Sequence, residues 1–170
     1  TLLTHTIKRF GIKAKVFESD NADDLESLID DKTKAIFFET LSNPQIAIPN
    51  IEKIVAIAQK YNIVTIADNT VATPILFQPL SHGIDVSVHS ASKYINGQGS
   101  AIGGLIIERK GLNEKLIGNP RYAHFNEPDE SYHGLVYAQL PFPIFSLRIR
   151  LSLIRDIGAT ISPYNSWLLI

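Results

Sequence analysis

Polar side chains gather at three places in the sequence where a short apolar run ends. These clusters are Glu39–Pro44, Asp68–Thr70 and His89–Lys93. The last cluster leads into four glycines, Gly97, Gly99, Gly103 and Gly104. Open α/β sheets bind their ligands outside the carboxyl ends of their strands. If the three runs are strands of one sheet, a single crevice collects a carboxylate, an amide, several hydroxyls and one lysine.

Pyridoxal 5'-phosphate (PLP) chemistry requires this combination of groups. A lysine such as Lys93 condenses with the aldehyde of PLP, and a carboxylate such as Asp68 keeps the pyridine nitrogen protonated, so that the ring accepts electrons. The phosphate needs hydroxyl and backbone N–H donors, and Ser90 and Ser92 lie just before the lysine. Asn43 is a candidate donor to the ring oxygen or to a substrate carboxylate.

Each of these residues also has an ordinary structural interpretation. A single lysine is most often a solvated surface charge, and serine–glycine runs are usually loops. Asp68-Asn69 and Asn43-Pro44 are both common turn sequences. The cofactor interpretation is favoured by the combination, because the groups occur in order at successive strand ends.

Strands that alternate with helices are expected to position these residues. Residues 50–61 carry apolar side chains at i, i+3, i+4 and i+7 behind Asn50 as N-cap, which predicts a helix. Residues 1–10, ended by Gly11, and 23–30 predict two more helices. Strands are predicted at 13–18, 34–39, 63–68, 84–89 and 102–108. The predicted fold class is α/β, with a mostly parallel sheet flanked by helices.

The last third of the chain has a different character. Residues 119–131 predict a polar loop, 140–143 a turn and 145–158 a helix with basic residues. Ser162-Pro163 predicts the N-cap and first position of a further helix that runs to Ile170. The first and last helices both look incomplete, so we expect the chain to be a piece cut at both ends.

Composition limits the class of protein. The hydrophobic share of 45% and the charged share of 19% are typical of a soluble globular protein. A formal net charge of −1 gives no reason to expect nucleic acid or an anionic membrane as a partner, and no apolar run is long enough to span a bilayer. The chain has no cysteine, which excludes disulfides and thiolate chemistry and fits a cytoplasmic location.

Competing motifs fit poorly. Glycines 97, 99 and 103 do not have the spacing G-x-G-x-x-G of dinucleotide-binding proteins. The phosphate-loop motif with its lysine does not occur in the sequence. The order Ser92-Lys93-Tyr94 also differs from the Tyr-x-x-x-Lys pair of short-chain dehydrogenases. The five histidines show no metal-ligand spacing, so we expect no metal site. Only His89 is expected near the cofactor, under or beside it.

Three sequence blocks resemble the Cys/Met-metabolism family of PLP-dependent enzymes. They are Glu39-Thr-Leu-Ser-Asn43-Pro44, Ala67-Asp68-Asn69-Thr70-Val-Ala-Thr73-Pro74 and His89-Ser90-Ala-Ser92-Lys93-Tyr94-Ile-Asn-Gly97. The similarity runs over nearly the whole chain, and the lysine block with Asp-Asn-Thr is highly specific. The implied fold is the PLP-dependent transferase fold type I, which is the aspartate-aminotransferase type. Residues 1–160 would be part of its large PLP-binding domain, and 161–170 would begin the helix leading to a C-terminal domain.

The resemblance also implies roles for individual residues. Lys93 would be the Schiff-base lysine and Asp68 the partner of the pyridinium nitrogen. Ser90 and Ser92 would be phosphate ligands, Asn43 a contact to cofactor or substrate, and Thr70 a candidate neighbour of the ring. The resemblance also implies a homotetramer built from active dimers.

Within the family, residues 126–134 and 155–165 look like the O-acetylhomoserine sulfhydrylase branch. The implied reaction is replacement at the γ-carbon of O-acetyl-L-homoserine by a sulfur nucleophile, giving homocysteine and acetate in methionine biosynthesis. The sulfur donor stays open between free sulfide, a thiol and a sulfur-carrier protein. The alternatives are cystathionine γ-synthase, cystathionine γ-lyase or methionine γ-lyase activity and, more remotely, a non-catalytic protein that keeps the PLP scaffold.

Overall fold

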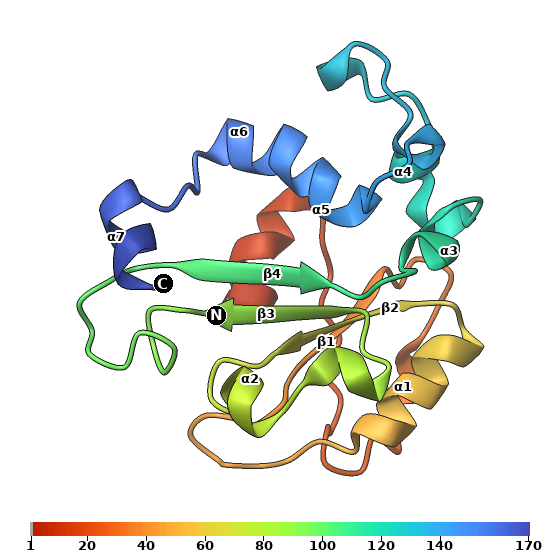
Figure 1. Ribbon diagram of the computed structural model, residues 1–170. Coiled ribbons are helices and arrows are strands. Elements are labelled where there is room, and N and C mark those ends of the chain that lie inside the picture. Colours follow the sequence, from red (N-terminus) through yellow and green to blue (C-terminus); the bar gives the residue numbers. More distant parts are fainter. Residues whose placement is uncertain (1) are drawn as a thin grey trace.

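Four short strands form one sheet in the computed structural model, which describes residues 2–170 (Figure 1). Their order in the sheet is β1 (Ala35–Glu39), β2 (Val64–Asp68), β3 (Val86–Ser90) and β4 (Gly104–Glu108). Strands β1, β2 and β3 run parallel, and β4 runs antiparallel to β3. The predicted α/β class with a mostly parallel sheet is therefore confirmed, and four of the five predicted strands are present.

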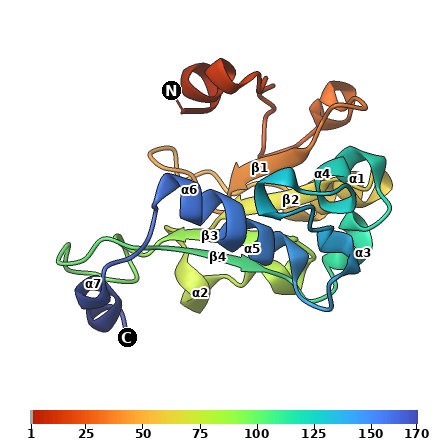
Figure 2. The ribbon, with the colours of Figure 1, turned by 90° about the horizontal axis from the view of Figure 1, so that it is seen from above.

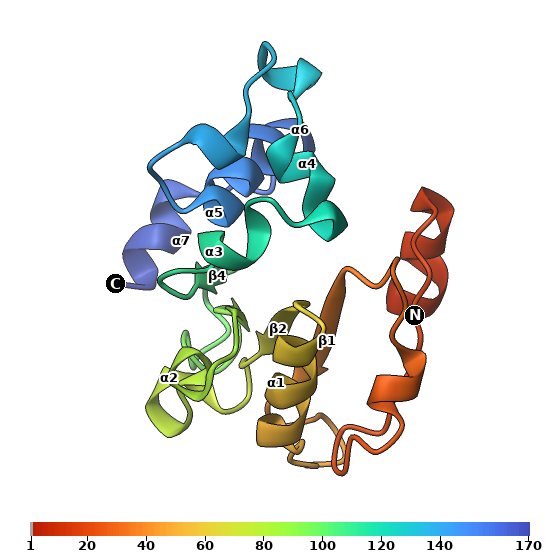
Figure 3. The same cartoon turned by 90° about the vertical axis from the view of Figure 1, so that its right-hand side faces the viewer.

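Helix α1 (Ile51–Lys60) covers one face of the sheet, as predicted from its apolar periodicity. The side chain of Asn50 accepts a hydrogen bond from the backbone N–H of Lys53 and caps the helix. Ile54 and Ala58 are buried against Ile36 and Phe38 of β1 in one apolar cluster. The short helix α2 (Thr73–Leu76) lies on the same side, as Figure 3 shows.

The opposite face is covered by helices from the last third of the chain (Figure 2). These are α3 (Asn113–Leu116), α4 (Ala123–Asn126) and α5 (Ile144–Arg148). Leu112, Leu116, Phe125, Tyr137 and Ile144 pack in a second apolar cluster with Val64 and Val86 of the sheet. The sheet thus lies between two helical layers, with a separate core on each face.

The helix predicted at 145–158 is present, with an irregularity that the sequence did not indicate. Helix α5 continues without a break through a π-helical stretch (Ile149–Ile154) into α6 (Arg155–Ile157), and it ends at Gly158 in a left-handed conformation. A further helix, α7 (Pro163–Leu168), begins behind Ser162, whose side chain accepts from the backbone N–H of Asn165. The predicted N-cap, Ser162, and the predicted first residue of the helix, Pro163, are confirmed.

Other predicted elements differ from the structure. Residues 13–18 do not form a strand, because no strand lies beside them among residues 2–170 to pair with their backbone. The helix predicted at 23–30 is a single 3₁₀ turn (Leu25–Leu28). The predicted loop at 119–131 contains the short helical segments Pro120–Tyr122, Ala123–Asn126 and Glu130–Tyr132. Asn119 and Asp129 cap two of them with their side chains.

The N-terminal helix is confirmed from Leu2 onward, since Leu2–Thr6 is π-helical and Ile7–Phe10 is a 3₁₀ turn. It ends at Gly11 with φ 75°, the left-handed conformation that glycine adopts without steric cost. Thr1, which the prediction included, lies outside the described residues. None of the helices between residues 2 and 170 combines the length and apolar character that a membrane span requires.

Candidate active site at the carboxyl end of the sheet

A cavity of about 630 Å³ opens where β1, β2 and β3 end. Parallel strands bring their carboxyl ends to one edge, so three segments far apart in sequence meet there. The volume lies within the usual range for small-molecule and cofactor sites. All six residues predicted from the sequence line this cavity: Asn43, Asp68, Thr70, Ser90, Ser92 and Lys93.

Asp68 is the last residue of β2 and is half-buried. The backbone N–H of Thr70 donates to Asp68 Oδ1 at 2.9 Å, which fixes the direction of the carboxylate. Among the described residues, Oδ2 has no hydrogen-bond partner, so one oxygen remains available to a ligand in the cavity. A carboxylate held in this way suits a cationic ligand atom, such as a protonated ring nitrogen.

Lys93 lies in the turn that follows β3. Its backbone N–H donates to the carbonyl of Ser90 at 3.1 Å, and its own carbonyl accepts from the N–H of Gly97 at 2.8 Å. Gly97 has φ 73°, and Gly99, which lines the same wall of the cavity, has φ 69°. Within residues 2–170, the Lys93 ammonium group forms no hydrogen bond or ion pair. The chain therefore fixes the backbone of Lys93 and leaves its amine without a protein partner.

The two serines next to Lys93 differ in how they use their hydroxyls. Ser92 Oγ accepts from the N–H of Gly103 at 2.9 Å and donates to the carbonyl of Gly103 at 3.2 Å, so it joins the two ends of the β3–β4 loop. Ser90 Oγ has no such partner among the described residues, although its backbone N–H donates to Thr70 Oγ1 at 2.7 Å. Of the two predicted phosphate ligands, Ser90 has the freer hydroxyl.

Asn43 lines the cavity from the segment that follows β1. Its backbone N–H donates to Glu39 Oε2 at 3.0 Å, and its side chain is exposed at the cavity wall. Glu39 itself lines the cavity and is the register partner of Asp68 on the neighbouring strand. Glu39 was not predicted as a site residue. The signal that would have found it is its position, because it ends β1 as Asp68 ends β2.

Further lining residues that the prediction missed are Leu41, Val71 and Tyr94. Leu41 lies within the first polar cluster, and Val71 and Tyr94 directly follow the second and third. All three supply apolar surface, which carries no chemical signature in the sequence. An apolar wall beside a few polar groups is the usual composition of a cofactor pocket.

His89 is close to the site but separated from it. It is buried in β3, and its Nε2 lies 2.9 Å from Ser87 Oγ. Its Nδ1 is also buried and has no partner among the described residues. Burial lowers the pKa of His89 below its ordinary value, against a smaller opposing effect of the nearby Asp68 charge. His89 is not among the residues that line the cavity, so it lies behind the wall.

The described residues fit an anionic aromatic cofactor with a basic ring nitrogen. An unpaired ammonium group, a carboxylate with a free oxygen and a free hydroxyl face one cavity beside glycines in left-handed conformations. In the part of the chain that the structure describes, histidine and acidic side chains do not gather into a group suited to a metal ion. The groups that line the cavity suit an organic cofactor of this kind.

Comparisons with known proteins identify the family and several relatives of the chain. The sequence model of the Cys/Met metabolism PLP-dependent enzyme family matches residues 1–170. A homocysteine/cysteine synthase of Saccharomyces cerevisiae is 38% identical over 167 residues, which are 97% of this chain and 37% of the yeast protein. An O-acetyl-L-homoserine sulfhydrylase of Leptospira meyeri is 36% identical over 175 residues, covering 98% of this chain and 39% of its own length.

Solved structures share the same fold. A crystal structure described as a putative O-acetylhomoserine (thiol)-lyase of Campylobacter jejuni, which contains a pyridoxyl-lysine phosphate, is 60% identical with a TM-score of 0.97. The match covers 99% of this chain and 42% of that one. Cystathionine γ-lyase of Lactobacillus plantarum is 30% identical with a TM-score of 0.72, over 99% of this chain and 35% of the other.

The chain thus spans about 35 to 42% of the length of these relatives. The fold is that of the PLP-dependent transferases of fold type I. Because the sequence model of the family matches all 170 residues, the chain belongs to the Cys/Met metabolism PLP-dependent enzymes.

Proposed function

We propose that this chain holds PLP in the cavity at the carboxyl end of the sheet, bonded to Lys93. The protein that contains the chain would catalyse γ-replacement on O-acetyl-L-homoserine with a sulfur nucleophile. The observation that carries the proposal is the placement of an unpaired lysine amine and a half-free carboxylate, Lys93 and Asp68, on one cavity. The names of the relatives in yeast, Leptospira and Campylobacter support the choice of substrate.

The geometry supports a role for each residue of the cavity. Lys93 Nζ would bond to the aldehyde carbon, and Asp68 would face the ring nitrogen. Ser90 and Ser92 would bind the phosphate, with Thr70 beside the ring. Asn43, which also lines the cavity, would donate to the ring oxygen or to the carboxylate of the substrate. When bound, PLP supplies an electron sink for the carbanion chemistry of the amino-acid substrate.

Lys93 would have a second role as the base that moves protons. With PLP bound, the Lys93 amine would take the proton from Cα of the substrate and would serve the proton transfer at Cβ. The C–O bond to acetate at the γ-carbon breaks, and a C–S bond from the nucleophile forms there. With hydrogen sulfide as nucleophile, the products are homocysteine and acetate.

The test compares Lys93→Ala with Lys110→Ala in the complete protein. Lys110 is an exposed lysine beyond the far end of β4, so its loss controls for the removal of one positive charge. After incubation with PLP and borohydride reduction, we expect the parent and Lys110→Ala to gain a stable pyridoxyl group, found by mass spectrometry at Lys93. A reducible covalent adduct that persists in Lys93→Ala would overturn the proposal.

Cleavage of cystathionine or methionine is the second candidate activity. It is favoured by the similarity to cystathionine γ-lyase of L. plantarum and to an L-methionine γ-lyase of Fusobacterium nucleatum, which is 35% identical over 116 residues. Incubation with O-acetylhomoserine and sulfide, against cystathionine or methionine alone, distinguishes the two. Homocysteine from the first mixture supports γ-replacement, while ammonia and a keto acid from the second support a lyase. Turnover in neither, despite bound PLP, would indicate a non-catalytic protein.

We further expect the protein to be a homotetramer in the cytoplasm. Residues 1–160 would be part of its large PLP-binding domain, and residues 161–170 would begin the helix that leads to a C-terminal domain. Light scattering of the complete protein measures the oligomeric state. Free sulfide, a thiol and a thiocarboxylated carrier protein can be compared as sulfur donors in the same homocysteine assay.

A further inference from the structure

Two buried polar residues lie directly behind the cavity without lining it. Thr40 follows β1 and is 5% exposed, and Asn69 follows β2 and is 0% exposed. Thr40 Oγ1 donates to Asn69 Oδ1 at 2.6 Å, a short hydrogen bond across the ends of the two strands. Their neighbours Glu39 and Asp68 line the cavity, so this pair forms the layer beneath it.

Asn69 fixes the end of β2 to three further parts of the chain. Its Nδ2 donates to the carbonyl of Phe77 at 2.9 Å. Its backbone N–H donates to the carbonyl of Val88 in β3 at 2.9 Å, and its carbonyl accepts from the N–H of Thr73 at 2.9 Å. The orientation of its side-chain amide is thus determined on both sides, with the oxygen toward Thr40 and the nitrogen toward Phe77.

The pair connects to the cavity through the backbone on each side of Asp68. The N–H of Thr40 donates to the carbonyl of Asp68 at 3.0 Å. On the other side of Asn69, the N–H of Thr70 donates to Asp68 Oδ1, and Thr70 Oγ1 accepts from the N–H of Ser90. A shift of Asn69 would therefore change the direction of the Asp68 carboxylate and the distance between Asp68 and the turn that carries Lys93.

We propose that Thr40 and Asn69 are positioning residues of the cofactor site. Their hydrogen bond holds the Asp68 carboxylate in the direction that pairs with a protonated ring nitrogen and keeps it in register with the Ser90–Lys93 turn. This inference rests on the proposed function, because it requires that Asp68 face the ring of PLP. It adds two residues that never touch the cofactor and yet set how strongly it binds.

The chain offers a matched control for a purely structural effect. Thr65 is 1% exposed and also uses its hydroxyl in buried hydrogen bonds, accepting from the N–H of Asp85 at 2.9 Å and lying 3.2 Å from Asp85 Oδ2. Thr65 is in the same strand as Asp68 but near its other end. Loss of either hydroxyl leaves a buried polar group unsatisfied, and only the loss at Thr40 is adjacent to the cavity.

The experiment uses Thr40→Val, Thr40→Ser and Thr65→Val in the complete protein. We measure the dissociation constant of PLP by fluorescence titration and the pH midpoint of the visible band of the holoenzyme. Thr40→Val is expected to weaken PLP binding about tenfold, the equivalent of one hydrogen bond, and to move the midpoint by about half a pH unit. Thr40→Ser, which restores the hydroxyl, is expected to return both values to those of the parent.

Thr65→Val is expected to lower the unfolding midpoint in denaturant while PLP affinity and the pH midpoint stay unchanged. If Thr40→Val does not fold, Thr40→Ala removes the same hydroxyl without placing a methyl group against Asn69. The inference is wrong if a folded Thr40 variant that lacks the hydroxyl keeps the PLP affinity and pH midpoint of the parent. That outcome would leave the covalent adduct at Lys93 intact, which separates it from a failure of the proposed function.

Discussion

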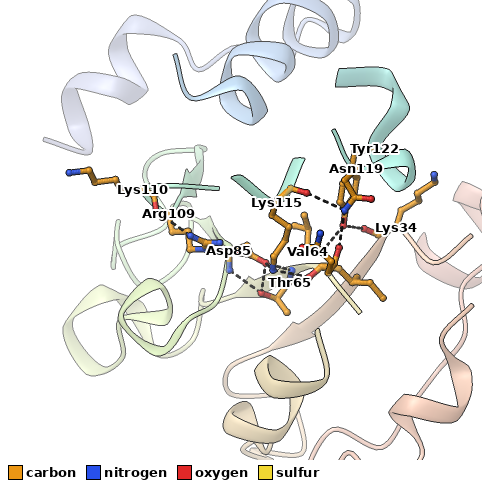
Figure 4. Close-up of polar contacts among 11 residues, drawn as sticks. Lys34, Val64, Thr65, Asp85, Arg109, Lys110, Lys115, Asn119 and Tyr122 are labelled. Carbon is orange, nitrogen blue, oxygen red and sulfur yellow. Dashed lines mark hydrogen bonds and ion pairs between the residues drawn. The ribbon is translucent and has the colours of Figure 1, made fainter. Parts of the chain in front are cut away.

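At the amino end of β2 and β3, an aspartate binds both a lysine and a threonine of the protein, whereas at the carboxyl end the same three kinds of residue line a cavity. Asp85 is 0% exposed, and its carboxylate accepts from Lys115 Nζ at 2.5 Å, from Arg109 Nε at 2.7 Å and from the N–H of Thr65 at 2.9 Å (Figure 4). Lys115 Nζ also donates to the carbonyl of Ile63 at 3.0 Å. All three charged groups at this end are paired within the protein, because the single carboxylate of Asp85 binds both Lys115 and Arg109.

The carboxyl end leaves its corresponding groups without such partners. Asp68 has one engaged oxygen, and the Lys93 amine has no partner among the described residues. Asp85 and Lys115 are buried, so their charges must be satisfied within the protein, whereas the half-buried Asp68 and the exposed Lys93 line a cavity and leave atoms accessible to a ligand. The residue types alone therefore do not distinguish a cofactor site from a structural ion pair. The two sites differ in burial, in the number of protein partners and in the presence of a cavity.

The largest expected difference is between Asp85→Asn and Asp68→Asn. Asp85→Asn leaves the buried Lys115 ammonium without its counter-charge and should lower the free energy of unfolding by about 3 kcal/mol. Asp68→Asn should leave stability nearly unchanged but weaken PLP binding by about tenfold or more, because a charge-assisted contact to the ring nitrogen is lost. Urea unfolding and PLP titration of both variants measure the two effects. Equal losses of stability in Asp85→Asn and Asp68→Asn would contradict the assignment of a structural role to the amino end of the sheet and a binding role to the carboxyl end.

Tyr122 offers a smaller test at the amino end. Its hydroxyl accepts from the N–H of Val64 at 2.7 Å and donates to the carbonyl of Lys34 at 3.0 Å, and burial raises its pKa to about 12. Tyr122→Phe leaves the buried N–H of Val64 without an acceptor and should cost about 1 to 3 kcal/mol in urea unfolding. Tyr164→Phe, at an exposed position, is the control and should be neutral. PLP affinity should not change in either variant.

The smallest expected effect is the pH dependence that His89 contributes. Its folded-state pKa is lowered by burial, so the unfolded chain binds the proton more readily than the folded one. The stability of the fold with neutral, buried His89 is fully present above the ordinary histidine pKa of about 6.5. It is lost as the pH falls from there toward the lowered pKa of His89 in the folded protein. Unfolding curves between about pH 5 and 8 should be less pH-dependent in His89→Asn than in the parent.

His133→Asn is the control for that series, because His133 is exposed and asparagine tolerates its left-handed backbone conformation. It should leave the pH dependence of the parent in place. A His89→Asn protein with the same pH dependence as the parent would show that another group is responsible.

The sequence allowed much of the carboxyl end to be predicted and little of the amino end. Asp68, Ser90, Ser92 and Lys93 occur in short blocks that follow apolar strands, so local sequence is enough to find them. The pair of Asp85 and Lys115 joins residues 30 positions apart, and its partners belong to different elements. Such a pairing depends on how α3 packs on the sheet, which local patterns do not encode.

The same distinction explains the remaining differences in the fold. Helix α1 was predicted because its N-cap and apolar spacing lie within one short segment. A strand at 13–18 would need a neighbouring strand to pair with. The residue pattern of 13–18 alone cannot show whether such a neighbour is present. Glu39 and Thr40 show the same limit, since their roles depend on their alignment with Asp68 and Asn69 across two strands.

The antiparallel direction of β4 has a consequence for how this site can change during evolution. The β3–β4 loop leaves the sheet at Ser90 and returns at Gly104, its register partner, and the hydrogen bonds between Ser92 and Gly103 close it at the base. Residues inserted between Gly97 and Gly99 would lengthen the tip while Lys93, near the closed base, stayed in register. Because the entropic cost of a longer loop grows slowly, the rim of the cavity can vary in length while its anchor is retained.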